Sequence, residues 1–121
     1  MLSKVKVDLN DYSYDIIISN SFIHSSVDFI RPFLKRNKVA LITDENVERF
    51  HLDHFRNSLK ANGIDVFSLS VSAGEISKDW NTLKRVVDWM LEVKLERDDL
   101  ILAFGGGVIG DLVGFASSIV R

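Results

Sequence analysis

The glycines near the end of the chain are the residues whose spacing most strongly indicates chemistry. Gly105, Gly107 and Gly110 satisfy the pattern G-x-G-x-x-G, and they follow the apolar run "LILAF". Glycines let the backbone turn sharply and approach a ligand, and the helix that follows presents unpaired N–H groups to a phosphate. A turn required by packing alone would also fit the pattern, but its position between a predicted strand and a predicted helix favours phosphate binding.

Asp111 comes directly after these glycines. An ordinary dinucleotide-binding fingerprint instead has an acidic residue about 20 positions later, which holds the ribose hydroxyls. In the first turn of the predicted helix, Asp111 could stabilise the helix N-terminus, as aspartate does well. It could equally hold a ligand hydroxyl, and physical reasoning leaves both roles open.

Two further loops follow predicted strands and carry polar residues. Asp44 and Asn46 come after "KVALIT", whereas Glu75 and Lys78 come after "DVFSLSV". Taken singly, Asp44 is better explained as a helix cap and Glu75 as a solvated loop acid. However, ligands bind outside the carboxyl ends of the strands in wound α/β sheets. Carboxylates and an amide there can hold ribose hydroxyls, and a lysine can offset phosphate charge, so together they favour a nucleotide site.

The elements that must position these residues are predicted from hydrophobic periodicity. Residues 5–9 alternate as in a half-buried strand, and residues 14–19 are typical of the returning strand of a hairpin. Residues 22–34 are typical of a helix that Pro32 ends or bends. Strands are then expected at 38–43, 65–71 and 99–104, alternating with helices at 45–62, 79–94 and from the glycines toward residue 121. This alternation predicts an α/β fold, a Rossmann-like parallel sheet with crossover helices plus an N-terminal β-hairpin. We expect residues 1–121 to form one domain that is incomplete, because another strand would normally follow the last helix.

The same periodicity predicts which side chains face the core. On the two middle helices, the expected inward residues are Val47, Phe50, Phe55, Leu59, Trp80, Leu83, Val87, Met90 and Leu91. In the last helix, the apolar side chains of Ile109, Leu112, Val113, Phe115, Ala116 and Ile119 are expected to lack a cover of further strands. Such an apolar patch favours self-association, so we expect the chain to oligomerise or to be marginally stable.

Composition excludes several classes of protein. The 121 residues have a formal net charge of −2 and no cysteine, which argues against nucleic-acid binding, disulfide scaffolds and thiolate chemistry. There is neither a signal peptide at the N-terminus nor an apolar run long enough to cross a membrane. We therefore expect a cytoplasmic protein. His51 and His54 have a spacing that can hold a metal, but they are better explained as exposed helix residues, and no metal site is expected within the chain.

The segments "TDENV", "AGEISK" and "GGGVIGDLVGFASS" resemble 3-dehydroquinate synthase, a family of sugar-phosphate cyclases. The resemblance covers essentially the whole chain but only the N-terminal third of a family protein. Iron-dependent alcohol and glycerol dehydrogenases share a similar glycine turn, but they continue with D-x-A-K. Here Asp111 is followed by Leu112, Val113 and Gly114, so the dehydrogenase pattern does not match.

The resemblance implies an NAD-binding domain and assigns residues to it. By position in the family motifs, the cofactor-binding residues would be Asp44, Asn46, Glu75, Lys78, Gly106, Gly107, Val108 and Asp111. Arg121 would match an arginine that reaches the substrate phosphate in the neighbouring subunit of a homodimer. An ordinary exposed arginine at a helix end remains the alternative for this last residue.

The resemblance also implies a reaction. Family members convert 3-deoxy-arabino-heptulosonate 7-phosphate to 3-dehydroquinate and phosphate in the shikimate pathway of aromatic amino-acid biosynthesis, with transient oxidation of the substrate by NAD. They need a divalent metal, zinc or cobalt, whose ligands would lie outside this chain, so these 121 residues should not catalyse the reaction alone. Two alternatives remain open: another sugar-phosphate cyclase of the 2-deoxy-scyllo-inosose synthase type, and a nucleotide-binding module without catalysis.

Overall fold

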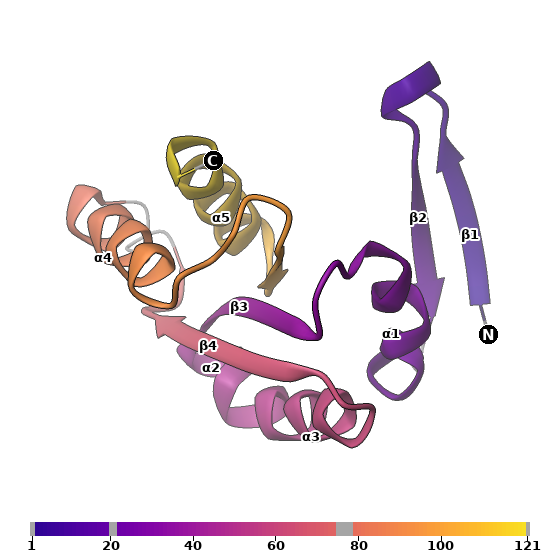
Figure 1. The fold of residues 1–121 in the computed structure, drawn as a ribbon, viewed down its shortest axis with the longest axis horizontal. Coiled ribbons are helices and arrows are strands. Elements are labelled where there is room, and N and C mark those ends of the chain that lie inside the picture. The colour runs from indigo at the N-terminus through magenta and orange to yellow at the C-terminus, as the bar shows by residue number, and fades with distance from the viewer. Residues whose placement is uncertain (1, 20–21, 75–78, 121) are drawn as a thin grey trace.

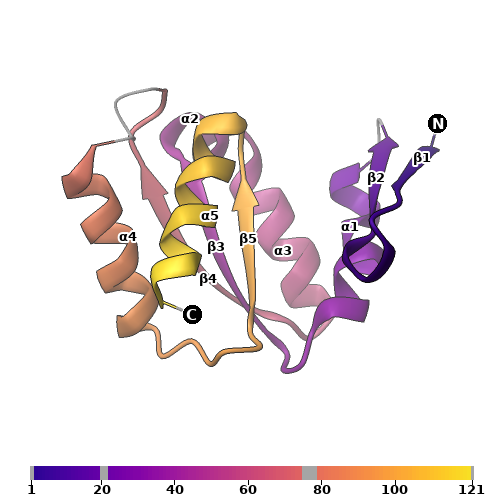
Figure 2. The same ribbon diagram turned by 90° about the horizontal axis from the view of Figure 1, so that it is seen from above.

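The structure is a computed structural model that describes residues 2–19, 22–74 and 79–120. A two-stranded sheet and a three-stranded sheet organise the chain, and they lie apart in space (Figures 1 and 2). The larger sheet carries helices on both faces, whereas the smaller one extends from one side of the molecule. The α/β fold that the sequence predicts is confirmed.

The smaller sheet is the predicted hairpin, although its first strand covers residues 2–7 rather than 5–9 and leaves Leu9 exposed outside it. Strand β1 (Leu2–Val7) pairs antiparallel with β2 (Tyr14–Ser19), with Val5 opposite Ile16. A short 3₁₀ turn (Asn10–Tyr12) connects the two strands. Asn10 has φ of 57°, in the left-handed region that asparagine tolerates better than most residues.

The larger sheet is parallel, as predicted. Its strands β3 (Lys38–Asp44), β4 (Asp65–Val71) and β5 (Leu100–Phe104) lie in the order β4-β3-β5. The central strand is covered on both faces, and its residues 39–43 are all buried. This burial explains why "KVALIT" is continuously apolar rather than alternating.

The helices largely match the predicted ranges. Helix α1 (Phe22–Ile30) gives way to a 3₁₀ turn (Arg31–Phe33) at Pro32, and helix α4 (Trp80–Glu92) begins after Asp79. The predicted helix at 45–62 is a short α2 (Glu45–Val47), a π-helical turn (Glu48–Leu52) and α3 (Asp53–Ala61) in direct succession. Gly63 ends it with φ of 78°. The last helix, α5 (Gly107–Val120), starts within the glycine motif.

Each face of the larger sheet has its own hydrophobic core. In Figure 1, α4 and α5 lie above the sheet and α3 lies below it. The upper core consists of Ile42, Val71, Val86, Met90, Ile109, Leu112, Val113 and Ala116. The lower core, which α1 also joins, consists of Val27, Ile30, Val39, Phe55, Leu59 and Ile64.

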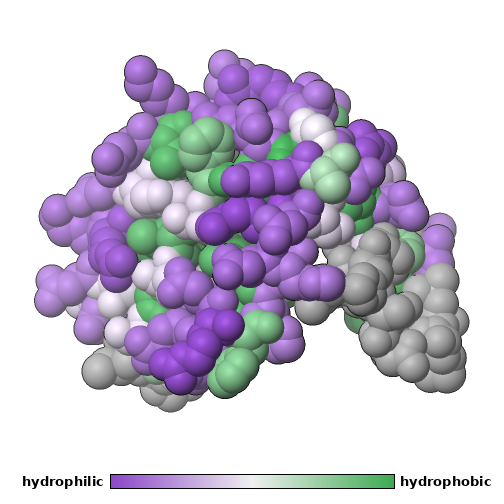
Figure 3. Space-filling view, turned by 90° about the horizontal axis from the view of Figure 1, so that it is seen from below, coloured by the Kyte–Doolittle hydropathy of each residue, from purple (hydrophilic) through white to green (hydrophobic). Residues whose placement is uncertain are grey.

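The outer face of α3 is polar, as expected for an amphipathic helix at the surface. Figure 3 views the molecule from this side, and hydrophilic residues cover most of what is visible, with apolar residues in separate patches. Among the described residues, no helix combines the length and apolar character needed to cross a membrane.

Several predicted core positions are wrong, for reasons that the helices make clear. Phe50 is 68 % exposed because the π-helical turn inserts extra residues and shifts the inward position to Leu52, which is 2 % exposed. Trp80 is 78 % exposed because it is the first residue of α4, beyond the cover of the sheet. Leu91 is also exposed, and Val86 is fully buried in its place. Phe55, Leu59 and Met90 are buried as predicted, whereas Val47, Leu83 and Val87 are half-buried.

The expectation of an uncovered last helix is wrong for most of its apolar residues. Ile109, Leu112, Val113 and Ala116 are buried against the sheet and α4, and Phe115 and Ile119 stay 53 % exposed. The three-stranded sheet therefore supplies more cover for α5 than the sequence indicates.

Candidate functional site

The carboxyl ends of the three parallel strands meet at one edge of the larger sheet, which is the upper edge in Figure 2. Asp44 ends β3, Val71 ends β4, and Phe104 ends β5. The loops that follow these strands are those that the sequence assigned to a nucleotide. Parallel pairing thus brings together segments that are up to 61 positions apart, since Asp44 pairs with Val71 and its neighbour Thr43 with Phe104.

The glycine turn at residues 105–107 contains glycines of two kinds. A Cβ at Gly105 would lie 2.9 Å from Cγ1 and 3.2 Å from Cβ of Ile109, closer than packed side chains normally approach. Gly105 is therefore required by the packing of α5 against β5. By contrast, a Cβ at Gly106, Gly107 or Gly110 would meet no atom within 4 Å in the part of the chain described.

None of these three open glycines has the positive φ that would by itself require glycine. Gly107 and Gly110 lie within α5, where each glycine weakens the helix by about 1 kcal/mol relative to alanine. No packing contact within the described residues compensates for this loss of helix stability. Bare backbone that faces open space is the geometry that a closely approaching ligand needs.

The start of α5 offers donors in the same place. The N–H of Gly110 donates to the carbonyl of Gly106 at 3.1 Å, which makes Gly106 the residue that precedes the first turn. The three N–H groups at residues 107–109 come before this bond and have no partner within the helix. Since Gly106 has no side chain, it cannot cap them as serine or aspartate would. The helix start is therefore suited to an anion.

Asp44 lies against this turn and has a structural role. Its Oδ1 accepts from the backbone N–H groups of Asn46 and Val47, both at 2.9 Å, and so caps α2. Its Oδ2 is directed toward the glycine turn, 3.5 Å from the position of a Cβ at Gly105. The sequence-based preference for a capping role is confirmed, and the Asn46 side chain beside it is exposed.

Asp111 lies one turn further along its helix than the sequence predicts. Because α5 begins at Gly107, Asp111 lies in the second turn, so the predicted position in the first turn is wrong. Its side chain is exposed and lines a pocket of about 340 Å³ between the first turn of α4 and the second and third turns of α5. We call this the α4–α5 pocket, and its lining residues are Asp79, Trp80, Leu83, Asp111, Leu112 and Phe115.

Sequence reasoning missed three residues of the α4–α5 pocket. Trp80 was assigned to the core, Phe115 to an uncovered patch, and Asp79 only to a helix start. One signal was available in the sequence. The loop before α4 follows the carboxyl end of β4, so the first residues of α4 must lie near the carboxyl edge of the sheet. Asp79 caps α4 by accepting from the backbone N–H of Thr82 at 2.7 Å, and this hydrogen bond lowers the pKa of the Asp79 carboxyl.

Three predicted site residues, Glu75, Lys78 and Arg121, lie outside the described residues. Val108, the fourth residue of the predicted glycine segment, is half-buried at the start of α5. No group of three or more histidine, aspartate or glutamate side chains gathers as a metal site in the described ranges.

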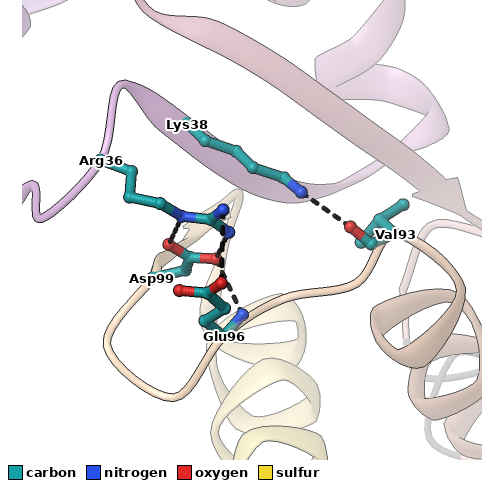
Figure 4. A network of polar contacts seen from close by, with 5 residues as sticks. All are labelled: Arg36, Lys38, Val93, Glu96 and Asp99. Atoms are coloured by element: carbon teal, nitrogen blue, oxygen red, sulfur yellow. Dashed lines mark hydrogen bonds and ion pairs between the residues drawn. The ribbon is translucent and has the colours of Figure 1, made fainter.

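The opposite edge of the sheet holds a polar network that Figure 4 draws. Asp99, whose side chain is 1 % exposed, accepts two hydrogen bonds from the Arg36 guanidinium, one of them from Nε at 2.9 Å. It also accepts from the N–H of Glu96 at 2.8 Å, and Lys38 donates to the carbonyl of Val93 at 2.7 Å. The Arg36 hydrogen bonds, opposed in part by burial, lower the pKa of Asp99 to about 2.

This network, which we call the Asp99 network, fixes the start of β5 relative to the start of β3. Asp99 directly precedes β5, and Arg36 lies two residues before β3. The glycine turn lies at the other end of β5. The Asp99 network therefore belongs to the framework that holds the turn rather than to the carboxyl edge.

Comparisons with known proteins agree with this geometry. A family model described as 3-dehydroquinate synthase N-terminal matches residues 68–121, which include the second half of β4 and all of α4, β5 and α5. The 3-dehydroquinate synthase of Roseobacter denitrificans is 46 % identical over all 121 residues, and that of Ruegeria sp. is 42 % identical over the same length. The chain covers 33 % and 32 % of these two proteins, so it spans about a third of the length of the curated relatives it matches.

A solved structure of 2-deoxy-scyllo-inosose synthase has the same fold, with a TM-score of 0.78 over 97 % of this chain and 33 % of that one, at 20 % identity. A second structure of that enzyme, equally similar in fold, was solved with carbaglucose-6-phosphate, NAD⁺ and Co²⁺.

The fold is thus that of the part of 2-deoxy-scyllo-inosose synthase that this chain matches. The sequence is similar to 3-dehydroquinate synthases over all 121 residues, and residues 68–121 match the N-terminal family model, which confirms the resemblance that the sequence motifs indicated.

Proposed function

We propose that this chain binds NAD at the carboxyl edge of its parallel sheet, as the nucleotide-binding part of a 3-dehydroquinate synthase. The observation that carries the proposal is the open space around Gly106, Gly107 and Gly110, which no packing within the described chain explains. A dinucleotide would fill this space, because its pyrophosphate needs both bare backbone and N–H donors.

The residues at this edge fit the group. The N–H groups of residues 107–109 at the start of α5 would receive the pyrophosphate, because they have no partner within the helix. Asn46, exposed at the end of β3, offers an amide for ribose hydroxyls. Asp44 would mainly hold α2 and the backbone of the first loop in position, since its Oδ1 already accepts two N–H groups.

We further propose that the reaction is the one implied by the family, conversion of 3-deoxy-arabino-heptulosonate 7-phosphate to 3-dehydroquinate and phosphate. When bound, NAD supplies a transient hydride acceptor for this chemistry. The residues of this chain bind and orient the cofactor, whereas metal ligands and further substrate contacts would come from residues beyond it. By itself the chain would therefore bind the cofactor without turning over substrate.

A 2-deoxy-scyllo-inosose synthase activity is the second candidate, because a structure of that enzyme has the same fold. Its identity of 20 % is much lower than the 42–46 % of the 3-dehydroquinate synthases. The sequence comparison therefore favours the 3-dehydroquinate synthase assignment.

The test is calorimetric titration of NAD⁺ into the wild-type chain and into Gly107→Ala. The added methyl group meets no atom of the described chain, so the variant should fold with an unchanged or slightly raised Tm. It should nevertheless bind NAD⁺ at least tenfold more weakly, because the methyl group would occupy the space of the pyrophosphate.

Gly114→Ala is the matched control. Gly114 also lies in α5 with open space around it, two turns beyond Gly107, and its substitution should leave binding unchanged. Equal NAD⁺ affinity in Gly107→Ala and Gly114→Ala would contradict the proposal, and so would a wild-type chain that binds no NAD⁺.

A further inference from the structure

The end of α3 is followed by Asn62 and Gly63, and no other asparagine of the chain precedes a glycine. In an unfolded chain, an asparagine before glycine loses its side-chain amide most readily, because glycine has no side chain to hinder attack by its own backbone nitrogen. Both residues are exposed, so water and base can reach them. The sequence and the exposure together make Asn62 a candidate site of spontaneous deamidation.

The reaction consists of a ring closure and a hydrolysis. A base removes the proton of the Gly63 N–H, and this nitrogen attacks Cγ of Asn62. The N–Cγ bond forms as the Cγ–Nδ2 bond breaks, and Nδ2 takes up a proton and leaves as ammonia. Water then opens the five-membered succinimide at one of its two carbonyl carbons, which gives either aspartate or isoaspartate. No oxidant, reductant or cofactor is needed.

The folded chain engages the attacking nitrogen in a hydrogen bond. The N–H of Gly63 donates to the carbonyl of Lys60 at 3.0 Å, and the N–H of Ile64 donates to the carbonyl of Leu59 at 3.1 Å. Together with the φ of 78° at Gly63, these two bonds form a Schellman motif. Ile64 and Leu59 are both buried in the lower core, which holds the motif in place. Removal of the Gly63 proton therefore requires this turn to open.

The side chain of Asn62 is also held away from that nitrogen. Its Nδ2 donates to the carbonyl of Ser58 at 2.8 Å, one turn back along α3. Closure of the five-membered ring needs Cβ of Asn62 and the Gly63 nitrogen nearly eclipsed about the Cα–C bond, whereas the ψ of 16° turns this nitrogen away from Cβ. Arg31 adds a contact from its Nη2 to the carbonyl oxygen of Asn62 at 3.4 Å. The folded geometry thus opposes the ring closure that the sequence favours.

We propose that Asn62 is a deamidation site that the last turn of α3 keeps closed, and that it reacts only in molecules in which this turn has opened by local unfolding. Helix ends open more often than the rest of a fold, and the rate of a slow reaction in the open form follows the fraction of open molecules. No ligand at the carboxyl edge takes part, so this inference is independent of the proposed function.

Deamidation would weaken the turn that normally prevents it. Aspartate has no side-chain N–H to donate to the carbonyl of Ser58, and its charge would lie beside the negative end of the helix dipole. Isoaspartate would lengthen the backbone by one carbon before β4, where the N–H of Asp65 donates to the carbonyl of Asn37 at 2.9 Å. The change is therefore one-way, and it leaves the end of α3 open more often.

The first experiment compares the rate of deamidation in the folded wild-type chain with the rate in the same chain unfolded by guanidinium chloride. Both samples are kept at the same mildly alkaline pH, and the proteolytic peptide that contains Asn62 is followed by mass spectrometry. Asn62 should react at least about tenfold more slowly in the folded chain. Equal rates in the two states would overturn the proposal, because the turn would then give no protection.

The second experiment separates local opening from unfolding of the whole chain. Ala61→Gly weakens the last residue of α3, and Glu92→Gly weakens the last residue of α4, which is also exposed. Ala61→Gly should speed deamidation of the folded chain about three- to fivefold and leave the rate in guanidinium chloride unchanged, whereas Glu92→Gly should change neither rate. Equal acceleration by both variants, or none by Ala61→Gly, would contradict a reaction through the last turn of α3.

The consequence of the reaction is tested with Asn62→Asp, which reproduces one of its products. The variant should have a lower Tm and faster hydrogen exchange at the N–H groups of Gly63 and Ile64. Asn57→Asp adds the same charge at an exposed position in the middle of α3 and should change the exchange of these two groups much less. Equal exchange in the two variants would show that deamidation does not weaken the turn.

Discussion

The two edges of the parallel sheet differ in how completely their polar and backbone groups are used by the chain itself. At the amino edge, Asp99 is buried and accepts hydrogen bonds from Arg36 and from the backbone of Glu96. At the carboxyl edge, Gly106 and Gly107 face open space within the described residues, and Gly106, which precedes α5, has no side chain that could cap the helix. The same strands connect both edges, so one edge can stabilise the fold while the other stays available to a ligand.

This difference has an energetic reason. A buried carboxylate is tolerated only when it is paired and hydrogen-bonded, so the amino edge must be closed within the chain. Helix N–H groups at an exposed edge can be satisfied by water until a ligand displaces it. The carboxyl edge can therefore remain without side-chain partners for its N–H groups, whereas the amino edge needs partners for its buried carboxylate.

The largest effect on stability is expected from Asp99→Ala. The substitution removes the buried acceptor of the Arg36 guanidinium and of the N–H of Glu96, and leaves Arg36 only its exposed ion pair with Glu96, at a cost of about 2–3 kcal/mol. This is below the ~3–5 kcal/mol for a fully buried pair, because the Arg36 side chain is 41 % exposed. Denaturant unfolding measures the change. Asp98→Ala is the control, since the neighbouring Asp98 is exposed and should cost under about 0.5 kcal/mol. Similar losses in both variants would remove the distinction between the edges.

Acid should weaken the amino edge in a defined range of pH. The pKa of Asp99 is about 2 in the folded chain, below the ~3.9 of an unfolded aspartate. A lowered pKa means that Asp99 contributes its full stabilisation above about pH 5 and loses it as pH falls through 4 toward 2. The difference in unfolding free energy between the wild-type chain and Asp99→Asn should thus be constant at neutral pH and shrink below pH 4. A difference that grows on acidification would contradict the ion pair.

At the carboxyl edge, Gly105→Ala separates the packing glycine from the open ones. Its methyl group would press on Ile109, which should cost about 1–2 kcal/mol through overpacking, whereas Gly107→Ala should not lower stability. Thermal unfolding of both variants measures this contrast. In a double-mutant cycle with Ile109→Ala, the combined loss should be smaller than the sum of the single losses, because the clash is relieved. Additive losses would show that Ile109 is not the obstacle.

The sequence predicts best those parts of the fold that depend on residues close together in the chain. The hairpin, the three parallel strands and the end of the second helix at Gly63 follow from period-two patterns, an apolar run and a single glycine. Phe50 was misplaced because the sequence gives no sign of the π-helical turn, which depends on how the helix packs against the sheet. Trp80 was misplaced because helical periodicity does not reveal that the first turn of α4 extends past the sheet.

The candidate site was predictable in its residue types but not in its arrangement. Residue types alone indicated that Asp44 and the glycine motif bear on one ligand, and strand pairing accounts for their proximity. No local sequence pattern indicates that Trp80 and Phe115 line the same pocket, since the two residues lie 35 positions apart on different helices.

What the sequence determined by itself was the alternation of strands and helices, the glycine motif after β5 and the similarity to 3-dehydroquinate synthases. Each depends on residues that are neighbours in the chain, where periodicity and backbone freedom act directly. Only the tertiary structure decided which of the glycines are required by packing. It also showed that a buried ion pair closes the edge opposite the glycine turn, and that a pocket with acidic and aromatic residues lies beside the turn. These depend on distances between elements, because packing and burial are set by what the folded chain brings together.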